Sequence, residues 1–193
     1  MKKQELILDT ILTQLSIPEE ERMIFISKAE VKKLEKGTPF MEPGKRCNKF
    51  IFVAEGILCY GIHTKESEIV IRNFLVGPSF GSYSIYSYLS NEPSWNFCKS
   101  LTETIIFEWP KSFMDELMLK VCWANFFNIL LVKFLILKEE REILRLQQDA
   151  SKRYLHFLKE FPNLLNSIPQ YYIASYLSIH PQSLSRIKRF YKK

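Results

Sequence analysis

The sequence has few of the residues that build catalytic and metal centres. It contains three scattered histidines and four cysteines, with no CxxC pair and no histidine at ligand spacing from a cysteine. Zinc and iron–sulfur sites require such clusters, and a nucleophile requires a general base beside it. We therefore expect no metal, no cofactor and no enzymatic activity. The cysteines are expected to be isolated, buried thiols at Cys47, Cys59, Cys98 and Cys122.

Long uninterrupted apolar runs are also missing. The nearest approach to a membrane span, Val121 to Leu137, is broken by Asn125, Asn128 and Lys133. The N-terminus, MKKQELILDTILTQ, contains acidic residues and no small-residue cleavage site, so it does not resemble a signal peptide. We expect a cytoplasmic protein without a membrane span. Its 193 residues, 47% of them hydrophobic, are sufficient for a packed core.

The net charge of +6 is unevenly distributed. Residues 152–193 contain eight Lys or Arg and one acidic residue, Glu160, whereas the first 151 residues contain 19 basic and 20 acidic residues. All of the excess positive charge is therefore C-terminal. Such an asymmetry is typical of a segment that contacts a polyanion, although a basic tail that only raises solubility is the alternative.

Glycine is confined to one region: all six lie between residues 37 and 81. Within and after this region, five short runs are rich in Val, Ile, Phe and Tyr and are bounded by glycine or charged turn residues. They are KFIFVAEG, ILCYGIH, SEIVIRNFL, NFCKSL and ETIIFEWP. We predict that they form successive antiparallel strands of a β-domain, preceded by helix up to about residue 30.

From Lys111 to Phe161 the sequence has neither glycine nor proline, which predicts one or more long helices. A coiled-coil-like stripe within this stretch consists of Ile129, Val132, Ile136, Ile143 and Leu146. A neighbouring apolar face consists of Phe126, Leu130, Phe134 and Leu137. Because two faces need cover, we predict that one packs on the strands and the other on a second copy in a parallel dimer. The alternative is that the stripe also packs on the β-domain.

Asp149 or Ser151 is expected to cap a helix that Pro162 ends. After it, QYYIASYLSIHPQSLSRIKRF matches the buried pattern of a helix-turn-helix. Counted from Gln170, the apolar and small positions are Ile173, Ala174, Leu177, Ile179, Leu184 and Ile187. Ser178 supplies the short polar residue expected at the turn, and Pro181 suits the first turn of the second helix.

Burial of Leu184 and Ile187 would turn the polar side of the second helix outward. Arginine can pair with guanine and glutamine with adenine, so we predict that DNA bases are read by Gln182, Ser185 and Arg186. Backbone contacts are predicted for Ser183, Lys188, Arg189, Lys192 and Lys193. An ordinary helical hairpin is the competing interpretation.

In its order of β-domain, long helix and terminal helix pair, the chain resembles the CRP/FNR family of bacterial transcription regulators. GTPFMEPGKRCNKFIFVAEGILCYG is similar to the opening of the family's β-roll, and IASYLSIHPQSLSRIKRF to its helix-turn-helix. The resemblance implies an α+β fold: an N-terminal antiparallel, jelly-roll-like β-roll with flanking helices (residues 1–112), a long dimerisation helix (113–148) and a helix-turn-helix domain (149–193). No β-hairpin wing is expected, because the sequence stops at Lys193.

The resemblance also implies site residues. Arg186 matches a base-reading arginine of the family, Gln182 stands in place of a glutamate, and Pro181 replaces an arginine. Cyclic-nucleotide binders of the family have Phe-Gly-Glu followed by an arginine about ten residues later. Here Ser82 replaces the acid, and Ser94 or Trp95 stands where the arginine belongs. The candidate effector pocket, not suited to cyclic AMP, comprises Phe80, Gly81, Ser82, Tyr83, Ser94 and Trp95.

These patterns predict a dimeric, DNA-binding transcription regulator with a degenerate sensor. Its expected partners are double-stranded DNA, a second copy of the chain, RNA polymerase and a small-molecule effector of unidentified chemistry. A ligand-sensing module whose terminal helices dock a protein is the first alternative, although such a helix more often has an apolar outer face. An enzyme on a cupin-like barrel is the last alternative, because only His63 falls in the β-region.

Overall fold

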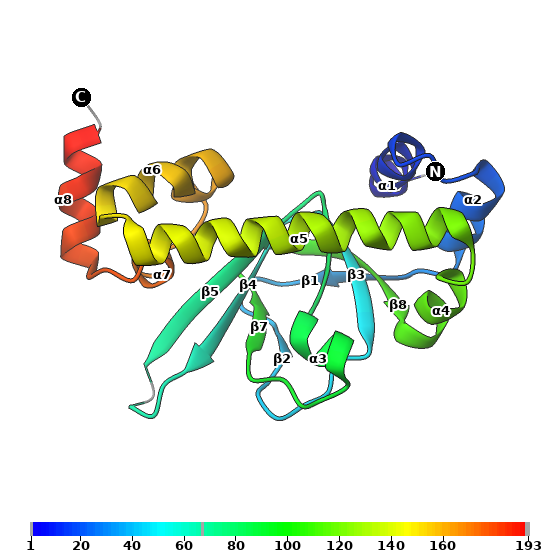
Figure 1. The fold of residues 1–193 in the computed structure, drawn as a ribbon, viewed down its shortest axis with the longest axis horizontal. Coiled ribbons are helices and arrows are strands. Elements are labelled where there is room, and N and C mark those ends of the chain that lie inside the picture. Colours follow the sequence, from blue (N-terminus) through cyan, green and yellow to red (C-terminus); the bar gives the residue numbers. More distant parts are fainter. Residues whose placement is uncertain (1, 67, 192–193) are drawn as a thin grey trace. The chain divides into compact units, whose positions relative to one another are not determined.

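The computed structural model describes residues 2–66 and 68–191. The chain divides into two compact units (Figure 1). The first consists of Met1–Tyr60 and Phe74–Val132, and the second of Gly61–Asn73 and Lys133–Lys193. The division cuts through one long helix and one β-hairpin, so each unit combines segments that are distant in the sequence.

The strands form two four-stranded sheets. One has the order β1-β8-β3-β6 and the other the order β2-β7-β4-β5. The five predicted strands are present as β3 (Lys49–Glu55), β4 (Ile57–His63), β5 (Ile69–Val76), β7 (Phe97–Ser100) and β8 (Thr104–Pro110). Three further strands, which the sequence patterns did not predict, are β1 (Glu30–Leu34), β2 (Pro39–Met41) and β6 (Ser79–Ser82).

Helices flank the strands of the first unit. Helices α1 (Lys3–Gln14) and α2 (Glu19–Ser27) precede β1, α3 (Ile85–Ser90) follows β6, and α4 (Lys111–Leu117) follows β8. Each of these helices is short. The N-terminal helical region predicted up to about residue 30 is thus two helices, and a strand begins at Glu30.

Aromatic side chains fill the core of the first unit. The rings of Phe25 and Trp109 stack with centroids 4.0 Å apart, and the Trp109 indole N–H donates to the Phe25 carbonyl at 2.8 Å. Trp123 and Phe126, from the start of helix α5 (Val121–Gln147), are fully buried in the same core. The first part of the long helix is thereby packed against the core. Of the face predicted to pack on the strands, Phe126 is buried, whereas Phe134 is 36% exposed.

Gly56 is required by the tight connection between β3 and β4. Its φ is +101°, and a Cβ at this position would lie 2.4 Å from Thr104 Oγ1 and 2.5 Å from the Glu103 carbonyl oxygen. We expect Gly56→Ala to lower the free energy of unfolding by more than the roughly 1–2 kcal/mol that a left-handed non-glycine residue costs, because backbone atoms must also move. Urea unfolding followed by tryptophan fluorescence measures the loss.

Gly44→Ala is the matched control for this substitution. Gly44 also has a positive φ, +86°, but nothing lies within 4 Å of an added Cβ. The control should therefore lose only the conformational contribution of roughly 1–2 kcal/mol. Equal losses in the two variants would show that the close approach to Glu103 and Thr104 does not matter.

Helix α5 has 27 residues and leaves much apolar surface uncovered. Its predicted stripe is exposed throughout, from 48% at Ile129 to 78% at Leu146. By length and composition the helix could cross a membrane: an 18-residue window has a mean hydropathy of 1.6, and 17% of that window is buried. The helix therefore needs a further cover that the single chain does not supply.

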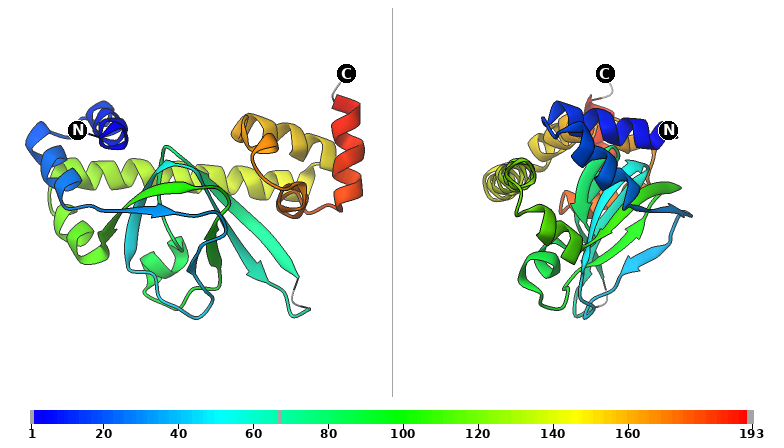
Figure 2. Two further views of the ribbon diagram at one scale, coloured as in Figure 1. Left: turned by 180° about the vertical axis from the view of Figure 1, so that it is seen from behind. Right: turned by 90° about the vertical axis from the view of Figure 1, so that its right-hand side faces the viewer.

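The second unit gathers short helices around the C-terminal part of α5 (Figures 1 and 2). They are α6 (Ala150–Glu160), a single 3-10 turn at Leu164–Asn166, α7 (Gln170–Tyr176) and α8 (Pro181–Tyr191). Asp149 caps α6, accepting a hydrogen bond from the Lys152 amide at 2.9 Å, as predicted. The tip of the β4–β5 hairpin, residues 61–73, belongs to this unit. The α+β fold class predicted from the sequence is confirmed.

Candidate nucleic-acid interface

Helices α7 and α8 are joined by a tight turn centred on Ser178. Ser178 has a left-handed backbone with φ of 55°. Its N–H donates to the Ser175 carbonyl, and the Ile179 N–H donates to the Ala174 carbonyl, both at 3.0 Å. This pair of hydrogen bonds is the Schellman arrangement that ends many helices, usually with glycine at the left-handed position. The short polar residue predicted at the turn therefore occupies it.

The positions predicted to pack between the two helices are buried or half-buried. Ala174 is the small residue at the crossing and is 1% exposed. Ile179 is half-buried. The remaining pattern residues are buried: Ile173, Leu177, Leu184 and Ile187. The local pattern thus determined which sides of α7 and α8 face inward.

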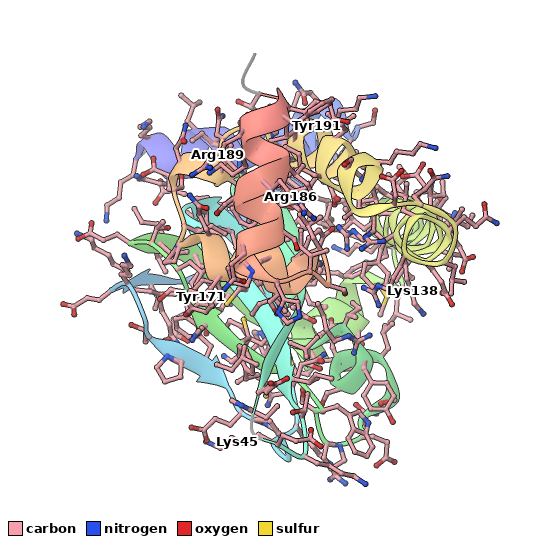
Figure 3. All side chains as sticks on the ribbon, turned by 90° about the vertical axis from the view of Figure 1, so that its left-hand side faces the viewer. Lys45, Lys138, Tyr171, Arg186, Arg189 and Tyr191 are labelled. Carbon is pink, nitrogen blue, oxygen red and sulfur yellow. The ribbon has the colours of Figure 1, made fainter. Side chains whose placement is uncertain are left out.

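The opposite side of α8 presents polar and basic groups. Figure 3 shows Arg186 and Arg189 on this helix. The predicted base-reading residues Gln182, Ser185 and Arg186 are all exposed. Of the predicted backbone contacts, Arg189 is exposed, and Ser183 and Lys188 are half-buried. Lys192 and Lys193 lie outside the described residues. Helix α8 carries no acidic side chain, so every charged side chain on it is positive.

The hydroxyl of Ser185 is partly committed within α8. It donates to the Pro181 carbonyl at 3.1 Å. The oxygen lone pairs of Ser185 remain available. In contact with a base or with a phosphate-bound water, the Ser185 hydroxyl would therefore accept a hydrogen bond. Ser185 is thereby a weaker candidate for base reading than Gln182 or Arg186, because its only hydroxyl proton is already donated within the helix.

Glu160 joins three helices of the second unit. It accepts hydrogen bonds from Arg141 of α5, at 3.1 Å from Nε, and from the Tyr176 hydroxyl of α7, also at 3.1 Å. Burial raises the pKa of the Tyr176 phenol, so Tyr176 remains a protonated donor. This cluster was not predictable from the sequence, because Arg141 and Glu160 are 19 positions apart and no local spacing links them.

Ser175 connects α7 to the β4–β5 hairpin. Its hydroxyl donates to the Ile69 carbonyl at 3.0 Å and accepts from the Ile71 N–H at 2.9 Å. Strand β5 is the last strand in its sheet, so these backbone groups have no neighbouring strand on that side. Ser175 therefore satisfies one donor and one acceptor of the sheet edge. No feature of the sequence pattern indicated this contact.

We expect Ser175→Ala to loosen the hairpin locally. Loss of a hydrogen bond contributing about 1 kcal/mol should raise the exchange rate of the Ile71 amide proton roughly fivefold. Hydrogen–deuterium exchange observed by NMR measures this rate. Ser185→Ala is the control, because its hydroxyl bonds only within α8. An unchanged Ile71 rate in Ser175→Ala would mean that the contact contributes nothing to the hairpin.

The residues of the candidate effector pocket lie in differing environments. Phe80 belongs to the aromatic core, with its ring centroid 4.8 Å from that of Phe52 and 5.0 Å from that of Phe126. Gly81 faces Leu75, whose Cδ2 would lie 2.9 Å from an added Cβ. Trp95 is 71% exposed. Its indole therefore does not line an enclosed pocket.

The other three pocket residues are buried and carry hydroxyl groups. Ser94 donates from its hydroxyl to the Asn96 carbonyl at 2.9 Å. Tyr83 donates to Glu108, which is 2% exposed and pairs with Lys32 at 2.8 Å. Ser82 is also buried, and its hydroxyl has no partner within the described residues. Most of the predicted pocket residues are therefore part of the packed core, and Tyr83 and Ser94 form hydrogen bonds with residues outside the predicted set.

The thiols lie in apolar surroundings. Cys47, Cys59 and Cys98 are buried, Cys122 is half-buried, and all four are free. Burial raises the pKa of Cys59 to about 11 and that of Cys98 well above its usual value. These two cysteines are thus neutral thiols near pH 7 and poor nucleophiles. Within residues 2–66 and 68–191, no group of three or more His, Cys, Asp or Glu could hold a metal ion.

Several solved structures share this fold. FixK2 from Bradyrhizobium japonicum matches with a TM-score of 0.73 and 15% identity, over 83% of each chain. The c-di-GMP-responsive global regulator CLP of Xanthomonas campestris matches at 0.64 and 12%, over 87% of this chain and 88% of that one. The catabolite activator protein of Thermus thermophilus matches at 0.53 and 14%, over 90% and 83%.

Such low identities establish a common fold and do not transfer a function. The chain has the fold of the CRP/FNR transcription regulators, as its sequence resemblance implied. The sequence matches no protein-family model and no curated protein.

Proposed function

We propose that this protein is a dimeric DNA-binding transcription regulator of the CRP/FNR type. The observation that carries the proposal is the outer face of α8, where exposed glutamine, serine and arginine side chains stand on a helix that is anchored by Leu184 and Ile187. Helices α7 and α8 form the reading head, with α8 in the major groove. A protein-docking helix would more often expose an apolar side.

Each subunit reads bases through Gln182, Ser185 and Arg186 and grips phosphates through neighbouring groups. Arginine and glutamine offer bidentate pairing to guanine and adenine, respectively. The proposed phosphate contacts are Ser183, Lys188, Arg189, Lys192 and Lys193. These contacts are electrostatic and sequence-independent, so they should weaken steeply as salt concentration rises.

A second copy of the chain is the proposed cover for the exposed stripe of α5. Leu146 is 78% exposed and Ile136 is 53% exposed, and such a stripe at heptad spacing suits a parallel helix pair. A bilayer is a poorer cover, because Lys133 and Lys138 interrupt the apolar surface and Glu139 to Glu142 follow directly with four charges. In the dimer, two reading heads would meet half-sites about one helical turn, roughly 34 Å, apart.

The β-roll is proposed to be a degenerate sensor whose effector is not cyclic AMP. Ser82 stands where the family has a ribose-binding acid, and no arginine occurs between Arg72 and Arg141 to neutralise a cyclic phosphate. We place the protein in the cytoplasm, with double-stranded DNA and RNA polymerase as partners and without a cofactor or enzymatic activity.

Fluorescence anisotropy against DNA from upstream of its own gene tests the proposal. Scrambled duplex serves as competitor, and a salt series gives the number of phosphate contacts. The expected result is binding that survives the competitor and falls steeply with salt. If a stoichiometric protein partner is isolated with the chain and DNA binding is weak and insensitive to sequence, the protein-docking alternative replaces the regulator.

A further inference from the structure

The second unit contains a hollow lined by residues of three neighbouring segments, two of which, α5 and α6, supply basic side chains. It lies among α5, α6 and the turn after α7, and it is open to solvent. Its empty volume, the open mouth and the solvent there included, is about 370 Å³. The polar groups that line it are Arg141, Arg145, Arg153, His156, Tyr176 and Ser178.

Helical spacing explains how these side chains converge. Arg141 and Arg145 are four residues apart on α5, so they share one face of that helix. Arg153 and His156 are three residues apart on α6 and also share a face. The face of α5 with Arg141 and Arg145 is distinct from the stripe of Ile136 and its neighbours. A dimer formed through the stripe would therefore leave the hollow open.

The positive charge of the hollow is only partly compensated. Of its three arginines, Arg141 is paired with a carboxylate, that of Glu160. His156 Nδ1 lies 3.8 Å from the same carboxylate. Asp149, the nearest acid in sequence to Arg153, is used to cap the Lys152 amide. One carboxylate against three guanidinium groups leaves two positive charges without a countercharge.

The hollow is also partly preorganised. Arg153 donates from Nε to the Leu177 carbonyl at 3.2 Å and from Nη1 to the Gln148 carbonyl at 2.7 Å. These bonds fix the guanidinium plane and leave Nη2 without a protein partner in the described chain. Arg141 likewise uses Nε and Nη2 on Glu160. Arg145 forms no hydrogen bond or ion pair within residues 2–66 and 68–191, so all of its donors are available.

We propose that this hollow binds the phosphate group of a ligand, between Arg145 and the remaining donors of Arg141 and Arg153. Arginine suits phosphate because its planar donors match the oxygens in pairs, and two guanidiniums already held in place lose little entropy on binding. The site contrasts with the β-roll, which lacks an arginine for this purpose. It borders Leu177 and Ser178, so its occupant would contact the turn that leads into α8.

Calorimetric titration of inorganic phosphate at constant ionic strength tests the site. We expect saturable binding of one phosphate per chain for the wild type and a loss of at least tenfold in affinity for Arg145→Gln. Arg145 is exposed and makes no structural bond, so this variant should fold, which its thermal unfolding curve checks. Lys138→Gln is the control, because Lys138 is an exposed base on the same helix outside the hollow.

Equal affinities in the three proteins, or weak unsaturable binding in all of them, would overturn the proposal. A second arm repeats the titration with the protein saturated by a 30-base-pair duplex. Phosphate binding that persists identifies a free ligand as the source of the phosphate group, whereas displacement identifies the DNA backbone. The first arm contains no DNA, so failure of the proposed function would not affect its outcome.

Discussion

Ile136→Asp is expected to convert the proposed dimer to a monomer. Ile136 lies in the middle of the exposed stripe of α5, and the dimer would bury two new carboxylates against apolar neighbours. Sedimentation velocity at micromolar concentration should show a single species of 22.9 kDa in place of a species of twice that mass. Since the second half-site is then no longer held nearby, affinity for a two-fold operator should fall roughly 10²- to 10⁴-fold.

Lys138→Asp is the control for this substitution. It introduces the same side chain two residues further along α5, off the stripe, and it should leave the mass and the DNA affinity close to those of the wild type. Retention of the wild-type dimer by Ile136→Asp would mean that the stripe is not the interface. Co-flotation of the wild-type protein with phosphatidylcholine vesicles would identify a bilayer as its cover.

Arg186→Ala is expected to cause the second large effect. Loss of a bidentate contact to guanine should cost about 1–3 kcal/mol per half-site and relax the base preference at one position. Because a dimer has two reading helices, this binding free energy would be lost at both half-sites. Anisotropy titrations with four operators, one for each base at that position, measure this preference. Similar affinities of Arg186→Ala for all four operators are expected.

Arg189→Ala provides the matched comparison on the same helix. Arg189 is exposed but is proposed to meet phosphate, so its loss should weaken binding to all sequences alike and reduce the slope of the salt dependence by about one. If the two variants lose affinity equally on every sequence, α8 does not read bases through Arg186, and the assignment of the reading helix is wrong.

Elements with a strong local signal were predictable from the sequence. Strands β3 and β4 are bounded by turn residues such as Gly56 and are rich in β-branched and aromatic residues. The turn at Ser178 and the burial of Ala174 follow from spacings within twenty residues. Strand β1 was not predicted, because it is an edge strand with the sequence EVKKL. Its charged residues protect the sheet edge, but they also obscure the alternation of apolar and polar residues that indicates a strand.

By itself, the sequence determined the fold class, the inward sides of α7 and α8, and the exposed stripe of α5, because these depend on periodicities within one or two turns or strands. Only the tertiary structure decided which distant residues meet. It brought Ser175 to the edge of β5, 104 positions from Ile71, and Arg141 to Glu160. It also gathered Arg145 and Arg153 around one hollow. A contact between two separate elements produces no periodic pattern in the sequence of either element, because the contact depends on how the chain folds back on itself.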